Sequence, residues 1–137
     1  MSAMAQIPGI EKIVEEYSNL DNVVAMNINE SMLGMFLDVE DDTFDEVDNI
    51  QIVLSEDPTI GKEIIGKANK VIKSIKAETM INVNEENRAI AIYTKKSGDI
   101  ITDIILTIEE EQSGVIAIAC QVPEDRLDEL VQVPMNL

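Results

Sequence analysis

The hydrophobic pattern between Pro58 and Val122 changes its period once, from that of a helix to that of a strand. From Pro58 to about Lys76 the apolar side chains recur at helical spacing and fill one arc about 140° wide. From Glu78 to Val122 apolar residues alternate, and turn residues divide the stretch into four segments. A long amphipathic helix followed by a meander of antiparallel strands accounts for both periods.

The rest of the chain adds shorter elements around this pair. Residues 8–20 read as an amphipathic helix behind Pro8-Gly9, and Pro123 begins a short helix through Leu127 and Val131. We also expect strands at 23–28 and 50–54, a Met-rich helix at 30–37, and a helix start at Ser55-Glu56-Asp57. The expected fold class is α+β, a mainly antiparallel sheet with a C-terminal four-strand meander, the long helix on one face and short helices at both ends.

The meander offers two faces of different character. The face with Ile100, Thr102, Ile104, Leu106 and Ile108 is richer in large side chains, so we expect it to receive the long helix. The other face is too apolar to be left wholly to water. It is covered by the first or last helix, or it is a protein-protein surface. The candidate interaction residues are Ala91, Tyr93, Ile101, Asp103, Ile105 and Ala117.

The composition argues against catalysis. The chain has no histidine, no tryptophan and one cysteine, so it lacks the side chain best suited to acid-base work near neutral pH. Cys120 lies in an apolar segment with no histidine to activate it, and we expect it to be a small buried hydrophobe. A hydrolase that uses carboxylates alone stays an alternative, but the expectation is a protein without enzymatic activity and without a cofactor.

The formal net charge of −17 bounds the partners. A field of this sign repels phosphate backbones and anionic headgroups, so nucleic acid and membrane-surface partners are disfavoured. No apolar run is long enough to span a bilayer. An unknown protein partner fits these constraints, and the sequence leaves the oligomeric state open.

The acidic run from Asp38 to Asp48 invites a cation-binding interpretation, because hard cations prefer clustered oxygen ligands. The run departs from the EF-hand template, with Thr43 where the turn needs glycine and Asn49 where a bidentate glutamate is needed. A solvated acidic loop is the simpler interpretation. An acidic cation-binding protein is the alternative function.

Several short motifs follow one another in a recognisable order. These motifs are IVEEYSN from Ile13, VVAMNI from Val23, SML from Ser31, VDNIQI from Val47, the Ser55-Glu56-Asp57 turn and the closing hairpins. Together they resemble the domain-of-unknown-function 4252 family over about Ile7 to Val131. The resemblance implies a small exported protein of Bacteroidetes-type bacteria with no established activity, and it supplies no catalytic residue.

The resemblance also affects the expected domain bounds and the expected cellular location of the protein. Ala3-Met4-Ala5 has the small-residue pattern of a signal-peptidase site, although no hydrophobic stretch precedes it. We expect residues 1–6 to be a disordered start or signal-peptide remnant, residues 7–133 a single domain, and residues 134–137 a tail. The expected location is the periplasm or another exported compartment, with the cytoplasm as the alternative.

Overall fold

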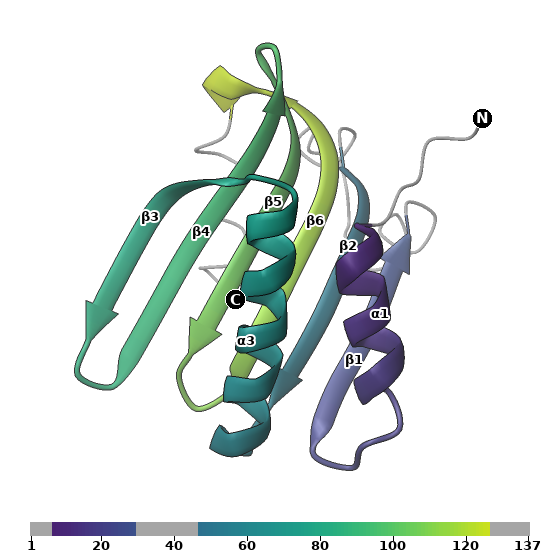
Figure 1. The fold of residues 1–137 in the computed structure, drawn as a ribbon, viewed down its shortest axis with the longest axis vertical. Coiled ribbons are helices and arrows are strands. Elements are labelled where there is room, and N and C mark those ends of the chain that lie inside the picture. The colour runs from purple at the N-terminus through teal and green to yellow at the C-terminus, as the bar shows by residue number, and fades with distance from the viewer. Residues whose placement is uncertain (1–6, 30–46, 127–137) are drawn as a thin grey trace, which may run out of the picture.

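The computed structural model describes residues 7–29 and 47–126. Over these ranges the chain forms one sheet, two α-helices and a short 3-10 helix (Figure 1). The elements in chain order are α1 (Pro8–Tyr17), β1 (Val23–Asn29), β2 (Val47–Ser55), α3 (Pro58–Ser74), β3 (Glu78–Glu85), β4 (Arg88–Ser97), β5 (Ile100–Glu109), β6 (Ser113–Pro123) and η2 (Glu124–Arg126).

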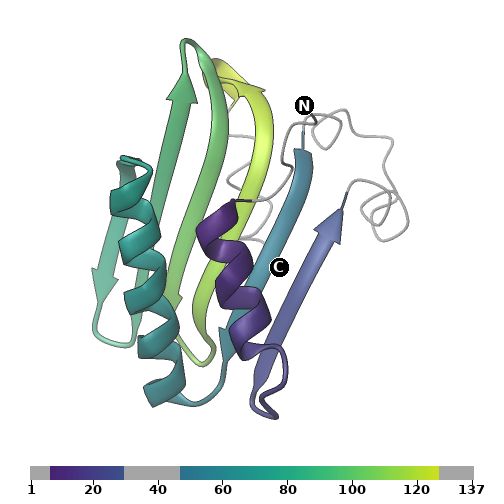
Figure 2. The same cartoon turned by 45° about the vertical axis from the view of Figure 1, so that its right-hand side comes forward.

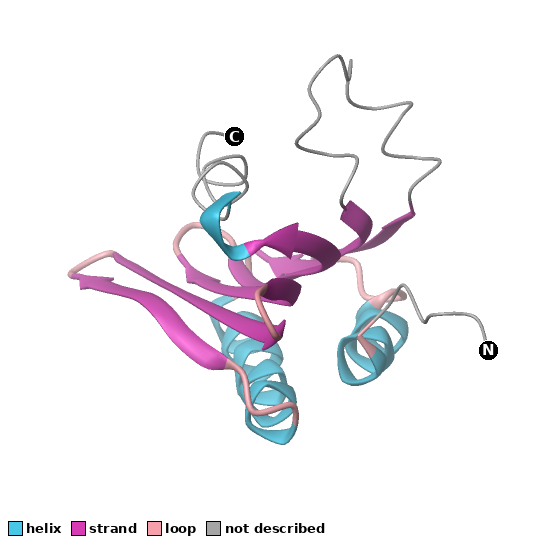
Figure 3. Ribbon diagram, turned by 90° about the horizontal axis from the view of Figure 1, so that it is seen from above, coloured by secondary structure: helices cyan, strands magenta, loops and turns pink. Residues whose placement is uncertain are grey.

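The sheet has six strands in the order β1-β2-β6-β5-β4-β3, and every neighbouring pair is antiparallel. Strands β3 to β6 follow each other in space as they do in sequence, while β2 pairs with β6 at the other side of the meander. Both helices lie on the same side of this sheet (Figures 2 and 3). The expected α+β class with an antiparallel sheet is therefore confirmed.

Helix α3 is the predicted long amphipathic helix, and its two ends have identifiable causes. Asp57 caps its start, because the carboxylate accepts hydrogen bonds from the backbone N–H of Thr59 at 2.8 Å and of Ile60 at 3.4 Å. The helix ends at Ser74, two residues before the predicted Lys76. Lys76 adopts φ 59°, and the N–H groups of Lys76 and Ala77 bond back to the carbonyls of Lys73 and Ile72, which is a Schellman ending.

Helix α1 packs beside α3 and against the β1–β2 end of the sheet. It ends at Tyr17, earlier than the predicted residue 20, where a turn leads into β1. The two helices approach closely at Gly9, where a Cβ would come within 2.5 Å of a methyl carbon of Val71. A side chain at position 9 would therefore push α1 away from α3.

Some sequence predictions differ from the structure, and others fall outside the described residues. Strand β2 begins at Val47 rather than Ile50, because pairing with both β1 and β6 extends it into the end of the acidic run. The predicted helix at 30–37 and the C-terminal helix beyond Arg126 lie outside the described residues. Within them, Pro123 is the last residue of β6 rather than the start of a helix, and the 3-10 helix η2 begins one residue later at Glu124.

The sheet face that receives the long helix is the reverse of the one expected. Ile64, Ala68 and Ile72 of α3 share a core cluster with Ile105, Val115 and Ala117, on the face with smaller side chains. Ile104 and Leu106 belong to a separate cluster on the other side. The alanines on β4 and β6 leave room for a helix whose own isoleucines fill the space, so small residues mark the covered face here.

Candidate functional site

The six predicted interaction residues do not form one exposed surface. Ala91, Ile105 and Ala117 are buried, and Ile105 and Ala117 lie in the core cluster shared with α1 and α3. Tyr93 is partly buried against the same cluster. Of the two interpretations of this face, cover by a helix is therefore the one the structure shows.

Ile101 and Asp103 do not lie together on the predicted face of the sheet. The register of β5 against β6 shifts between them, so Ile101 joins Ile104 in the cluster on the opposite side of the sheet. Asp103 is partly buried, and its carboxylate accepts a hydrogen bond from the hydroxyl of neighbouring Thr102 at 2.9 Å. A bulge is invisible to a strict two-residue alternation, which is why the predicted set mixed both faces.

The face turned away from α1 and α3, called the distal face below, carries aliphatic side chains on every strand. In antiparallel pairs directly opposed residues share a face. One row of paired residues therefore crosses all six strands: Met26, Ile52, Ile116, Leu106, Ile92 and Ile81. A second row runs through Val24, Leu54, Gly114, Ile108, Ile90 and Val83.

Exposure varies along this distal face. Ile92, Ile104 and Leu106 are at most 2% exposed, whereas Ile52, Leu54, Ile108 and Ile116 are only partly buried, and Met26 and Val24 are 38% and 47% exposed. Neither α-helix in the described ranges covers this side. Ile28, Ile50 and Ile81 are also accessible, so the aliphatic surface extends over this face and includes the strand ends that meet the β5–β6 turn.

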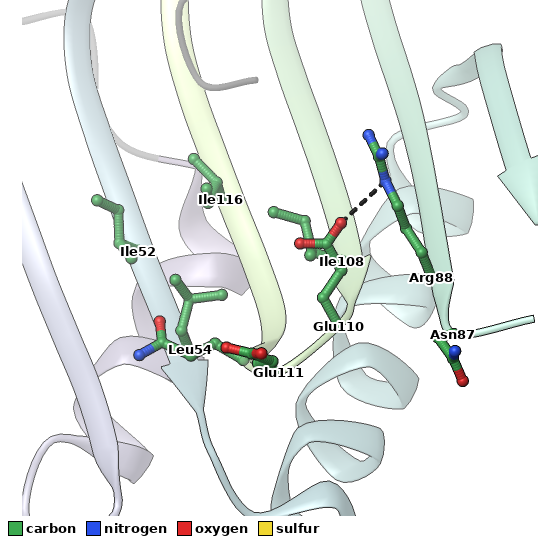
Figure 4. Close-up of a pocket in the computed structure, with 9 residues that line it drawn as sticks. Ile52, Leu54, Asn87, Arg88, Ile108, Glu110, Glu111 and Ile116 are labelled. Carbon is green, nitrogen blue, oxygen red and sulfur yellow. Dashed lines mark ion pairs between the residues drawn. The ribbon is translucent and has the colours of Figure 1, made fainter. Parts of the chain in front are cut away.

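Gly114 explains why a hollow forms at this place. It stands between Leu54 and Ile108 in the second row and contributes no side chain, so the row is interrupted there. Only glycine fits, because at φ 158° a Cβ would overlap the backbone carbonyl of Val53. The open hollow has a volume of about 650 Å³, with Ile52, Leu54, Ile108 and Ile116 as its apolar floor (Figure 4).

Polar and charged side chains form the rim of the hollow. Arg88 at the start of β4 pairs through its Nε with Glu110, at 2.9 Å, and both side chains stay close to half exposed (Figure 4). Asn87, Glu111 and Gln112 complete the rim from the two neighbouring turns. An apolar floor inside a polar rim is the usual composition of a protein recognition site. The residues of the rim and floor offer carboxylates, amides, one guanidinium and aliphatic side chains, and no thiol, hydroxyl or imidazole.

Titratable groups with altered pKa values lie elsewhere, between α1 and α3 and near η2. Burial raises the pKa of Tyr17, whose hydroxyl donates a hydrogen bond to Glu63 at 3.1 Å. The ion pair with Glu16 raises the pKa of Lys67, whose Nζ lies 5.0 Å from the Tyr17 ring centroid. The ion pair with Glu124 likewise raises the pKa of Lys96. These contacts fasten α1 to α3 and the β6 end to β4, and they are structural.

Within the described ranges, the remaining candidates from the sequence form no second site. Residues 38–46 of the acidic run lie outside the described ranges, and Asp48 belongs to β2. Within those ranges no three acidic or cysteine side chains gather as a metal-binding group. Cys120 is 3% exposed with its Sγ 3.5 Å from the Ile101 carbonyl, which confirms it as a buried apolar residue. No helix in the described part is long and apolar enough to cross a membrane.

Sequence reasoning missed the distal hollow although a signal was present. By sequence alone Gln112-Ser113-Gly114 is a turn signal between two strands, but Ser113 and Gly114 belong to β6. A glycine inside a strand often marks close backbone approach, and here it also leaves a gap in an aliphatic row. Locating that gap beside Leu54 and Ile108 required the strand order, which the sequence did not determine.

Comparison with known proteins places the chain in one family. Neither the curated proteins nor the solved structures include a significant match. Residues 17–130, from the end of α1 through all six strands, match the family described as "Domain of unknown function (DUF4252)". The match spans most of the chain and agrees with the resemblance carried by its motifs. The chain therefore belongs to the DUF4252 family, whose function is uncharacterised.

Proposed function

We propose that the chain is a non-enzymatic interaction module of the cell envelope that binds a protein partner through the distal hollow. The observation that carries this proposal is the set of partly exposed aliphatic side chains at Ile52, Leu54, Ile108 and Ile116, inside a polar rim. Accessible apolar patches rimmed by polar groups are typical of protein interaction sites. The proposed surface replaces the helix-covered face considered from sequence.

The chemical composition supports a binding role over a catalytic one. The chain has no histidine, and its single cysteine is buried away from the hollow. The rim instead offers carboxylates, amides and one guanidinium, which position a partner by hydrogen bonds and charge. The envelope location rests on the family resemblance, and fractionation of cells that make the protein naturally tests it.

Site-specific photo-cross-linking tests the binding surface. A benzoylphenylalanine placed at position 54 probes the hollow, and the same group at position 70, on the exposed side of α3, is the matched control. We expect a defined cross-linked protein from position 54 that is absent from position 70. Equal products from both positions, or none from either, would reject the hollow as the interaction surface.

The alternative function, cation binding by Asp38 to Asp48, stays a prediction from the sequence. The run contains clustered carboxylates, which are the ligands that calcium prefers. Calorimetric titration with calcium decides it. Absence of heat at millimolar calcium rejects a cation-binding role.

A further inference from the structure

We propose that the partner docks a cationic segment in the distal hollow, with one aliphatic side chain as its anchor and lysine or arginine residues on either side. This inference rests on the proposed function, because it names the kind of partner that the same hollow would accept. Two independent features carry it: the missing side chain at Gly114 and the charge of the turns around the hollow.

The first feature is the absent side chain at Gly114, which leaves room for one aliphatic side chain of the partner. Gly114 leaves one side-chain position open between Leu54 and Ile108, in a row that is otherwise aliphatic across the sheet. An incoming aliphatic side chain would complete that row and contact the floor on both sides. Burying such a side chain favours binding, and a hot spot of this kind commonly dominates an interface.

The second feature is the negative charge of the turns beside the hollow, which favours basic residues on either side of the partner's anchor. The β3–β4 and β5–β6 turns lie side by side, joined by the Arg88–Glu110 pair. Arg88 is thereby engaged, and among the described residues no ion pair involves the other carboxylates of these turns. Of these exposed carboxylates, Glu111 lines the hollow, and Glu85 and Glu86 lie in the adjoining β3–β4 turn.

These carboxylates favour a basic partner over the other occupants of an apolar hollow. A second copy docked with the two hollows facing each other would bring Glu111 and the turn carboxylates of both copies together, and like charges at an interface oppose association. An anionic partner meets the same repulsion, strengthened by the net charge of −17. A cationic segment instead gains attraction at the rim while its anchor fills the gap.

Fluorescence anisotropy with a synthetic probe tests the inference on the full chain. The probe is a fluorescein-labelled peptide with one leucine between two pairs of lysines. One control peptide replaces the leucine with glycine, and a second replaces the lysines with glutamates. We expect binding of the first peptide alone, with affinity that falls as salt is added.

Matched variants separate the hollow from the general negative charge of the protein. Glu111→Gln should weaken the peptide roughly two- to fivefold at low ionic strength, while Glu15→Gln on the exposed side of α1 should leave it unchanged. Leu54→Ala should weaken it roughly tenfold, against no change for Leu20→Ala, whose side chain is 42% exposed. Thermal unfolding of each variant verifies that the fold is retained.

The outcomes distinguish this inference from the proposed function. Equal binding of the leucine and glycine peptides, or equal effects of Glu111→Gln and Glu15→Gln, would overturn the cationic segment. A dimer in sedimentation that Leu54→Ala dissolves would also overturn it, since the occupant would then be a second copy. A specific cross-link at position 54 would in each case leave the proposed function standing, whereas its absence would remove both.

Discussion

Gly61 of α3 lies against Ser113 of β6 so closely that a Cβ on the glycine would come within 2.5 Å of the serine Cβ. From the sequence, Gly61 only weakens a helix. The structure shows that it lets the helix approach the sheet at its buried side, where Gly61 itself is buried. Helix α3 and the start of β6 depend on this contact.

Gly61→Ala should therefore destabilise the protein although alanine is the better helix former. Overpacking a tight contact costs about 1–3 kcal/mol, and the gain in helix propensity offsets about 1 kcal/mol. We expect a net loss of about 1 kcal/mol in the free energy of unfolding, measured with urea. Gly66→Ala is the control, because nothing lies within 4 Å of a Cβ there, and it should stabilise by about 1 kcal/mol. Equal stabilisation by both substitutions would contradict the close contact.

Ile105→Ala should be strongly destabilising, because Ile105 is completely buried beneath the helices. Removing a buried isoleucine side chain costs about 2–5 kcal/mol, depending on how far the cavity collapses. Ile100→Ala on the same strand is the control, since Ile100 is 38% exposed and should lose less than about 1 kcal/mol. Chemical denaturation compares the two. A small loss at Ile105 would mean that the helices do not cover this face.

Lys76→Gly should stabilise the end of α3. Lys76 adopts φ 59°, a left-handed conformation that costs non-glycine residues about 1 kcal/mol and that glycine adopts freely. We expect a gain of about 0.5–1 kcal/mol in the free energy of unfolding. Lys73→Gly, in the last turn of the helix, should instead cost about 1 kcal/mol. A loss at both positions would argue against the Schellman ending.

Stability should decline at alkaline pH in part through Tyr17. Burial raises its pKa above the ordinary 10.0, with Glu63 adding to the shift and Lys67 opposing it. The phenol of the unfolded chain therefore loses its proton first, so the contribution is complete below pH 10 and is lost as pH rises through the folded pKa. Tyr17→Phe should lack this component, so its free energy of unfolding should decline less between about pH 9 and pH 11 than that of the wild type.

An absorbance titration checks the same point directly. Tyr17 and Tyr93 are the two tyrosines of the chain, so Tyr93→Phe leaves Tyr17 as the sole phenolic signal. The folded protein should ionise at a higher pH than the same variant in urea. Identical titration curves in the two states would show that burial of Tyr17 does not favour the neutral phenol.

Local sequence signals accounted for most of the secondary structure. Asp57 and Pro58 identified the start of α3, and its apolar arc identified Ile64, Ala68 and Ile72 as the buried side. Turn residues such as Asn87 and Gly98 lie in the sequence where the strands of the meander are separated. These features depend on neighbours a few residues apart, so a linear pattern contains the information.

The candidate site could not be derived in the same way. Leu54 and Ile108 lie far apart in sequence and flank Gly114 only because β2 pairs with β6 at the edge of the meander. The face with larger aliphatic residues looked like the natural seat for α3, yet α3 packs on the face with Ala91 and Ala117. The register shift between Ile101 and Asp103 also places Ile101 on the face opposite to the one that strict alternation predicts.

The sequence by itself determined the class of the fold, the bounds of the described helices and of β2 to within a few residues, and the strongly negative charge of the chain. Periodicity and capping are local, and they suffice for these. Only the tertiary structure decided which sheet face the helices cover and where an apolar hollow remains. The position of a helix on a sheet depends on how closely the two surfaces can approach, as the contact of Gly61 with Ser113 shows. That shape complementarity is a property of residues brought together from distant parts of the chain.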